Sequence, residues 1–158
     1  MASVLSGEGL RFLYRSEDGM IDRRVWWLGA TPLAAILFVM TMIWIVLSPY
    51  AKRGLDERAF IDAMTLTAYL YLAVFAFAVI FICVCFVMLS MKRLRDRGRP
   101  PGLAGALPLA ALLAGAANWL EPQVDGTLVS VLAITSWAAL AAALVWTIVE
   151  MGVLEGKR

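Results

Sequence analysis

The sequence predicts an all-α membrane protein with four transmembrane helices and both termini in the cytoplasm. Composition is the first observation: of 158 residues, 62% are hydrophobic and 16% charged, against roughly 45 to 50% and about 25% in soluble domains. The second is that the apolar residues fall in four runs, each long enough to cross about 30 Å of hydrocarbon. The third is that the lysines and arginines cluster between particular runs.

Residues 1–24 form an N-terminal segment that we assign to the cytoplasm or the membrane interface. Its four arginines are Arg11, Arg15, Arg23 and Arg24. It has no sustained apolar core followed by a cleavage site, so we expect no cleaved signal peptide. Residues 10–15 predict a short interfacial turn of helix, held by Phe12 and Tyr14. Asp18-Gly19 then predicts a turn.

The membrane domain, residues 25–149, starts with helices predicted over 25–47 and 64–91. Trp26 and Trp27 open the first helix and Trp44 lies near its other end. That spacing of about 27 Å matches the two membrane interfaces, where tryptophan is enriched.

Both of these helices have predicted ends. Ser48-Pro49-Tyr50 is expected to end the first. The second apolar run spans about 42 Å as a helix, more than the bilayer core requires, and we expect it to continue into Lys92 and Arg93.

The third and fourth runs predict helices over 103–120 and 127–149, which a short connection makes antiparallel neighbours. Small residues, closed by an asparagine, recur every four positions along the third run. They are Gly102, Ala106, Ala110, Ala114 and Asn118. Such a stripe lets helix backbones approach closely, although an alanine-rich helix also produces such spacings by chance. Its expected partners on the fourth helix are Ala138, Ala139, Ala142 and Ala143.

The distribution of lysine and arginine predicts the orientation. Residues 1–24 hold four of them, the connection after the second run five and the C-terminal end two, whereas the first connection holds three and the third none. The positive-inside rule therefore places both termini and the basic connection in the cytoplasm. Residues 150–158 are then a cytoplasmic tail.

The basic segment, residues 92–102, is the main candidate site. Its sequence is Lys92-Arg93-Leu94-Arg95-Asp96-Arg97-Gly98-Arg99-Pro100-Pro101-Gly102. A charge at the centre of the hydrocarbon costs roughly 2.5 to 3.5 kcal/mol, so this segment is expected at the headgroups. The prolines are expected to stop the second helix. Two interpretations remain open: a topology anchor alone, or a site for anionic lipid or a protein partner.

A second motif precedes the first helix and consists of Gly19, Arg23, Arg24, Trp26 and Trp27. Its companion in the basic segment is Arg93, Leu94, Arg95, Asp96, Arg97 and Gly98. Together, over residues 12–150, they resemble the bacterial inner-membrane proteins grouped as domain of unknown function 805. That family has a glycine, a basic residue and an arginine ahead of an aromatic pair, and later an Arg-Leu-His-Asp segment. The resemblance implies the bacterial cytoplasmic (inner) membrane and carries no activity.

The chain departs from that family pattern at three places. Met20 stands where the family has a basic residue, and Arg95 replaces the family's histidine. The stretch after Pro100 lacks the usual tryptophan. A proton-handling role for the histidine therefore does not carry over.

Asp96 is expected to pair with Arg23 or Arg24. An arginine beside the membrane entrance and an aspartate at the end of another helix can form a hydrogen-bonded ion pair. Such a pair would clamp the first and second helices at their cytoplasmic ends. Glu150 either joins this network or stays solvated.

The sequence contains no catalytic, metal-binding or nucleotide-binding constellation. It has no histidine, and Cys83 and Cys85 point about 200° apart on a helix, so they cannot bridge. No charged residue lies deep within the apolar runs, which disfavours ion-coupled transport. We therefore expect no cofactor, no metal and no nucleic-acid partner.

The favoured function is a non-enzymatic one, in which the cytoplasmic Arg/Asp cluster binds anionic phospholipid headgroups or a protein partner. One alternative is a small channel or exporter that acts as a homo-oligomer. A lipid-modifying enzyme that uses Asp96 is less favoured, because it needs a second acid or a metal ligand nearby.

Overall fold

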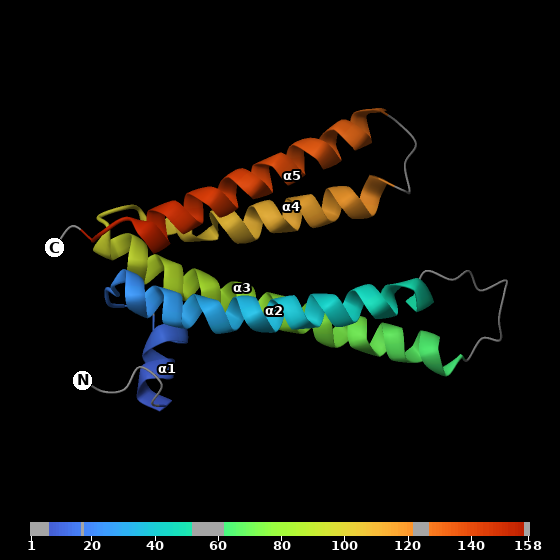
Figure 1. The fold of residues 1–158 in the computed structure, drawn as a ribbon, viewed down its shortest axis with the longest axis horizontal. Coiled ribbons are helices and arrows are strands. Elements are labelled where there is room, and N and C mark those ends of the chain that lie inside the picture. Colours follow the sequence, from blue (N-terminus) through green and yellow to red (C-terminus); the bar gives the residue numbers. More distant parts are fainter. Residues whose placement is uncertain (1–6, 17, 52–61, 122–126, 157–158) are drawn as a thin grey trace. The chain divides into compact units, whose positions relative to one another are not determined.

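The computed structural model describes residues 7–16, 18–51, 62–121 and 127–156, and every regular element in these ranges is helical (Figure 1). The elements are α1 (Gly7–Tyr14), α2 (Arg23–Ala51), α3 (Ala63–Asp96), the 3₁₀ turn η1 (Pro101–Gly105), α4 (Ala106–Leu120), α5 (Thr127–Thr147) and the π-helical turn η3 (Ile148–Val153).

Among the described residues, four helical stretches are long and apolar enough to cross a membrane. They are Arg23–Ala51, Ala63–Asp96, Pro101–Asn118 and Val129–Val153. The predicted all-α fold with four candidate transmembrane helices is therefore confirmed. The orientation of the termini stays a prediction.

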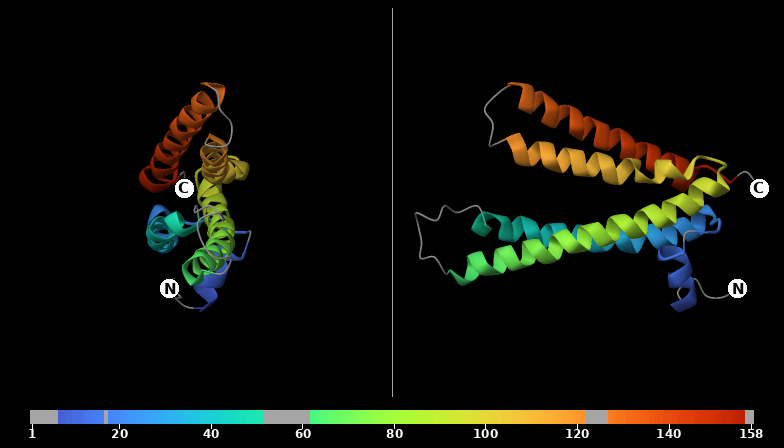
Figure 2. Two further views of the ribbon diagram at one scale, coloured as in Figure 1. Left: turned by 90° about the vertical axis from the view of Figure 1, so that its right-hand side faces the viewer. Right: turned by 180° about the vertical axis from the view of Figure 1, so that it is seen from behind.

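The chain divides into two compact units, one formed by Met1–Gly29 with Cys85–Arg158 and the other by Ala30–Val84. In the second unit α2 and α3 run side by side in opposite directions (Figure 2). The Tyr71 hydroxyl on α3 donates to the carbonyl of Met40 at 2.7 Å. The rings of Trp44 and Phe75 stack with their centres 6.4 Å apart. An aromatic seam thus joins the two helices.

Helix α2 is longer than predicted at both ends. It begins at Arg23 because Asp22 is its N-cap: the Asp22 carboxylate accepts the Val25 N–H at 2.8 Å. At the other end it passes Pro49 and stops at Ala51. Proline removes one backbone donor, and the Ser48 hydroxyl supplies another to the Ile45 carbonyl at 3.2 Å. The helix therefore continues through the predicted stop at Ser48-Pro49-Tyr50 as far as Ala51, the last residue described there.

In the first unit α4 and α5 run antiparallel and adjacent, as predicted (Figures 1 and 2). On α4 the small stripe is partly confirmed, since Ala114 is buried and Ala106 and Ala110 are half-buried, while Gly102 and Asn118 are exposed.

On α5 only Ala143 of the four predicted partners lies on the packed side. Ala138, Ala139 and Ala142 are exposed. The less exposed side carries Ala133, Ser136, Leu140 and Ala143. These four positions follow the three-and-four spacing of a single helix face.

Glycine, rather than proline, ends α3. Gly98 has a φ of +66°, the left-handed conformation that glycine adopts without strain. Its N–H bonds to the carbonyl of Arg95 at 3.0 Å, and the Arg99 N–H bonds to the carbonyl of Leu94 at 2.9 Å. This is a Schellman cap, so the basic segment leaves the helix before Pro100.

Gly98→Ala is expected to lower the free energy of unfolding by about 1 to 2 kcal/mol, because alanine is strained in the left-handed region. Gly98→Asn should cost less, since asparagine tolerates that conformation. Thermal unfolding in detergent would measure both. Gly102→Ala is the matched control, because a Cβ there meets nothing within 4 Å. Equal stabilities of the alanine variants at 98 and 102 would contradict the cap.

Candidate functional site

Lys92 is fully buried, with 0% of the residue exposed. Its ammonium donates to the carbonyls of Phe12 and of Leu13, the latter at 2.9 Å, and lies 4.6 Å from the centre of the Phe12 ring. The last four carbonyls of a helix lack intrahelical donors and carry partial negative charge. Lys92 therefore caps the C-terminal end of α1.

Arg93, the next residue, caps the carbonyls at the C-terminal end of the helix formed by α5 and η3. It is 1% exposed, and its Nε donates to the Met151 carbonyl at 2.9 Å. Its Nη2 donates to the carbonyl of Leu154, and its Nη1 donates to the carboxylate of Asp96. The planar guanidinium thus binds two carbonyls beyond α5 while Asp96 balances its charge.

Residues 151–155 present five consecutive carbonyls, each of which accepts a hydrogen bond from a side chain. Besides Arg93, the donors are the Trp27 indole to Gly152 at 3.1 Å, Arg23 to Val153 at 3.4 Å, and Arg97 to Glu155. Side chains from α2 and the basic segment therefore hold the C-terminal part of the first unit.

Glu150 lies within this cluster. The residue is 6% exposed, and its Oε1 accepts from the Nε atoms of Arg97 at 3.4 Å and Arg99 at 3.2 Å. Glu150 was predicted either to join a network of Asp96 with Arg23 or Arg24 or to stay solvated; it is buried instead, and its partners are Arg97 and Arg99.

The two tryptophans at the entrance of α2 have different surroundings. Trp26 is 2% exposed; its indole donates to the Ser90 hydroxyl at 3.4 Å, so this ring packs inside the unit and is not free to sit against lipid. Trp27 lies against Gly152, where a Cβ would stand 2.7 Å from the indole ring. Only glycine at position 152 leaves room for that ring.

Tyr14 also acts within the protein. Its hydroxyl donates to the Gly29 carbonyl at 2.8 Å, which ties α1 to α2. Burial raises the pKa of Tyr14 above its ordinary value, which favours the protonated phenol that donates this bond. Tyr14 was predicted to hold α1 at the membrane interface, but its hydroxyl bonds to Gly29 within the protein. The other predicted interfacial residue, Phe12, is exposed.

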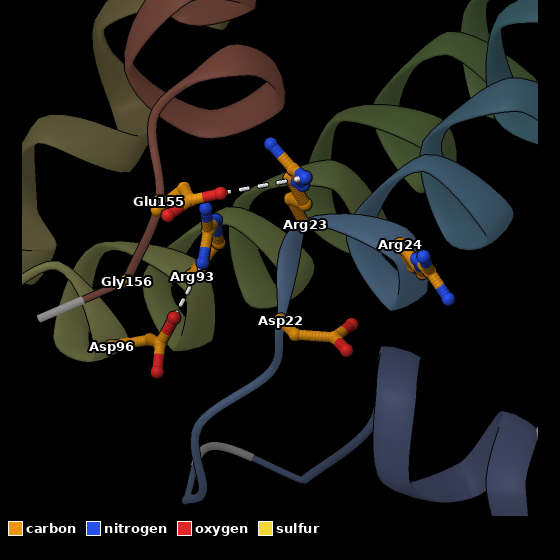
Figure 3. A pocket seen from close by; sticks show the side chains of 7 residues that line it. All are labelled: Asp22, Arg23, Arg24, Arg93, Asp96, Glu155 and Gly156. Atoms are coloured by element: carbon orange, nitrogen blue, oxygen red, sulfur yellow. Dashed lines mark hydrogen bonds and ion pairs between the residues drawn. The ribbon is translucent and has the colours of Figure 1, made fainter. Parts of the chain in front are cut away.

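A pocket of about 230 Å³ opens at the entrance of α2 (Figure 3). Its lining is Asp22, Arg23, Arg24, Arg93, Asp96, Glu155 and Gly156. Arg93 pairs with Asp96, and Arg23 lies 3.6 Å from Glu155. Within the described ranges, no ion pair joins Asp22 or Arg24 to another side chain. Figure 3 shows these two side chains on the same side of the α2 entrance.

The structure brings together four of the predicted site residues, Arg23, Arg24, Arg93 and Asp96. The predicted pairing of Asp96 with Arg23 or Arg24 is not the one found between described residues. Asp96 pairs with Arg93 because the two stand one turn apart on the same helix. Arg23 lies instead 3.6 Å from Glu155, in the segment after α5, and both side chains are exposed.

The remaining predicted residues have structural positions. Leu94 is fully buried, and Arg95 lies 4.0 Å from Asp18. Gly98 forms the cap described above. Gly19 has a φ of +112° and faces the Phe12 ring, which a Cβ would approach to 2.7 Å.

Three lining residues were missed from the sequence. Asp22, directly before an apolar run, carries a recognisable N-cap signal. Glu155 and Gly156 carry none, because a tail that supplies backbone acceptors has no characteristic sequence. In the part of the chain that the structure describes, no three acidic or cysteine side chains are grouped to hold a metal ion.

Arg93→Met is expected to lower the free energy of unfolding by about 3 to 5 kcal/mol, because it leaves the buried Asp96 carboxylate without this partner. Adding Asp96→Asn should recover part of that loss. Denaturant unfolding in mixed micelles would measure the double-mutant cycle. Arg24→Met, at an exposed arginine of the same pocket, is the control and should change stability by no more than about 0.5 kcal/mol. No recovery in the double variant would count against the Arg93–Asp96 pair.

A scan against protein-family models, a search of curated proteins and a search of solved structures found no match to this chain. The resemblance to domain of unknown function 805 therefore stays a prediction.

Proposed function

We propose that this protein is a non-enzymatic, multi-pass membrane protein that binds the phosphate of a phospholipid headgroup in the pocket at the entrance of α2. The observation that carries the proposal is Arg24. It lines the pocket, is exposed, and has no ion pair among the described residues. An arginine with free N–H donors matches the geometry of a phosphate group and can bind it bidentately.

The position of the pocket along the helices supports a lipid ligand. Arg24 lies in the first turn of one candidate span, and Asp96 is the last residue of another. Charged residues at the ends of apolar spans lie at headgroup depth. Large apolar side chains along the spans are exposed, Phe77 to 76% and Ile134 to 69%, and acyl chains would cover them.

The contacts of the basic segment support Arg24 rather than the cations that the sequence favoured. Lys92 and Arg93 donate to backbone carbonyls, and Arg97 and Arg99 donate to Glu150. Lys92, Arg93 and Arg97 are therefore poorly placed to receive a ligand, whereas the Arg99 side chain stays 58% exposed but does not line the pocket.

The same contacts favour binding over catalysis. The buried Asp96 carboxylate is paired with Arg93 and therefore has a structural role, and the exposed Glu155 carboxylate lies 3.6 Å from Arg23. The bacterial cytoplasmic membrane is part of the proposal and is supported by the family resemblance. The cytoplasmic side is supported by the distribution of lysine and arginine.

Arg24→Gln is expected to reduce the phospholipid that co-purifies with the protein by about tenfold, the effect of losing one charge-assisted hydrogen bond. Extraction and mass spectrometry would give the lipid-to-protein ratio. Arg15→Gln is the matched control, since Arg15 is exposed and does not line this pocket. An equal loss in both variants would show a general charge effect, and no loss in Arg24→Gln would refute the proposal.

The proposed topology has its own test, in a chain with Cys83→Ser and Cys85→Ser. Met20→Cys, at a position 52% exposed, is expected to resist a membrane-impermeant maleimide in intact cells and to react after permeabilisation. Ala63→Cys, at the start of α3, is expected to react from outside and serves as the control. Labelling of position 20 in intact cells would contradict the cytoplasmic assignment.

A further inference from the structure

The pocket carries equal numbers of positive and negative side chains, three arginines against two aspartates and one glutamate. Two pairs lie within the lining, a buried one between Arg93 and Asp96 and an exposed one between Arg23 and Glu155 at 3.6 Å. One charge of each sign, Arg24 and Asp22, lines the pocket without an ion pair among the described residues. A purely anionic ligand would pair with Arg24, but the negative charge of Asp22 would repel that ligand.

We infer that the pocket takes a zwitterionic phosphoethanolamine headgroup, with its phosphate at Arg24 and its ammonium at Asp22. The inference rests on the proposed function and names the headgroup class. A phosphate ester of ethanolamine carries a negative and a positive charge within one small group. A single headgroup can therefore pair with both side chains.

The local geometry of Asp22 supports this assignment. Its Oδ1 accepts the Val25 N–H at 2.8 Å, which fixes the carboxylate as the cap of α2. The second oxygen has no hydrogen-bond partner among the described residues and remains an acceptor. Figure 3 shows Asp22 and Arg24 extending on the same side of the helix entrance. Both side chains line the pocket.

The lining also discriminates between two zwitterionic headgroups. A primary ammonium donates three hydrogen bonds, and carboxylates accept them. Choline has no N–H to donate and is recognised by aromatic faces. The seven residues that line the pocket include no aromatic side chain. The arrangement therefore favours ethanolamine over choline.

The experiment uses the full chain in nanodiscs that contain equal amounts of phosphatidylethanolamine, phosphatidylglycerol and phosphatidylcholine. Native mass spectrometry measures which lipid stays bound. The wild type is expected to retain phosphatidylethanolamine over the other two. Asp22→Asn should lower the ratio of phosphatidylethanolamine to phosphatidylglycerol by about tenfold, the effect of one charge-assisted hydrogen bond. It should still fold, because asparagine caps helices as well as aspartate does.

The controls separate this inference from the proposed function. Asp18→Asn removes an exposed acid outside the pocket and should leave the ratio unchanged. If Asp22→Asn leaves the ratio unchanged while Arg24→Gln lowers all bound phospholipid, the amine assignment fails and the phosphate site stands. If Arg24→Gln also has no effect, the proposed function fails with it.

A soluble arm identifies the source of the headgroup. Glycerophosphoethanolamine is added to the wild type and to Asp22→Asn in detergent. If the soluble ester displaces phosphatidylethanolamine from the wild type but not from Asp22→Asn, the result would support recognition of the phosphoethanolamine group itself. Binding of the soluble ester without any retention of phosphatidylethanolamine would overturn the lipid source.

Discussion

The first unit depends on two adjacent buried cations that cap the ends of two different helices. Burying an unpaired carbonyl or an unpaired cation away from water costs free energy. Here the buried cations donate hydrogen bonds to the helix-end carbonyls, so neither group is left unpaired. Successive residues on a helix point about 100° apart, so Lys92 and Arg93 reach α1 and η3 respectively. The end of α3 thereby becomes the common attachment point of the first unit.

This constraint also separates structural charges from charges available to a ligand. The basic segment has the composition of a membrane-surface patch, yet Lys92, Arg93 and Arg97 donate to backbone carbonyls or to Glu150. What remains at the pocket is one arginine and one aspartate from the entrance of α2. Arg24 and Asp22 are therefore chosen as the proposed ligand contacts because they are exposed and without an ion pair among the described residues, and not because cations are dense around them.

The sequence was sufficient for the four helices, because hydrocarbon thickness sets a minimum length for an apolar run. Their ends were harder to predict. A single hydroxyl on Ser48 lets α2 pass Pro49, and the left-handed Gly98 ends α3 ahead of the prolines. Arg93 and Asp96 were predicted as site residues, but most of the partners are backbone carbonyls, which every residue has and no pattern marks. Glu155 looked like part of an ordinary tail.

The row of carbonyls from Met151 to Glu155 bears on how the protein is made. A ribosome synthesises these residues after every element whose side chains bind them. Until they emerge, Arg93 has only Asp96, and Trp27 has no acceptor at Gly152. The pocket is therefore completed only after these residues are made, and a chain that stopped at the end of α5 would carry α2 to α5 without the Glu155 and Gly156 that line the pocket.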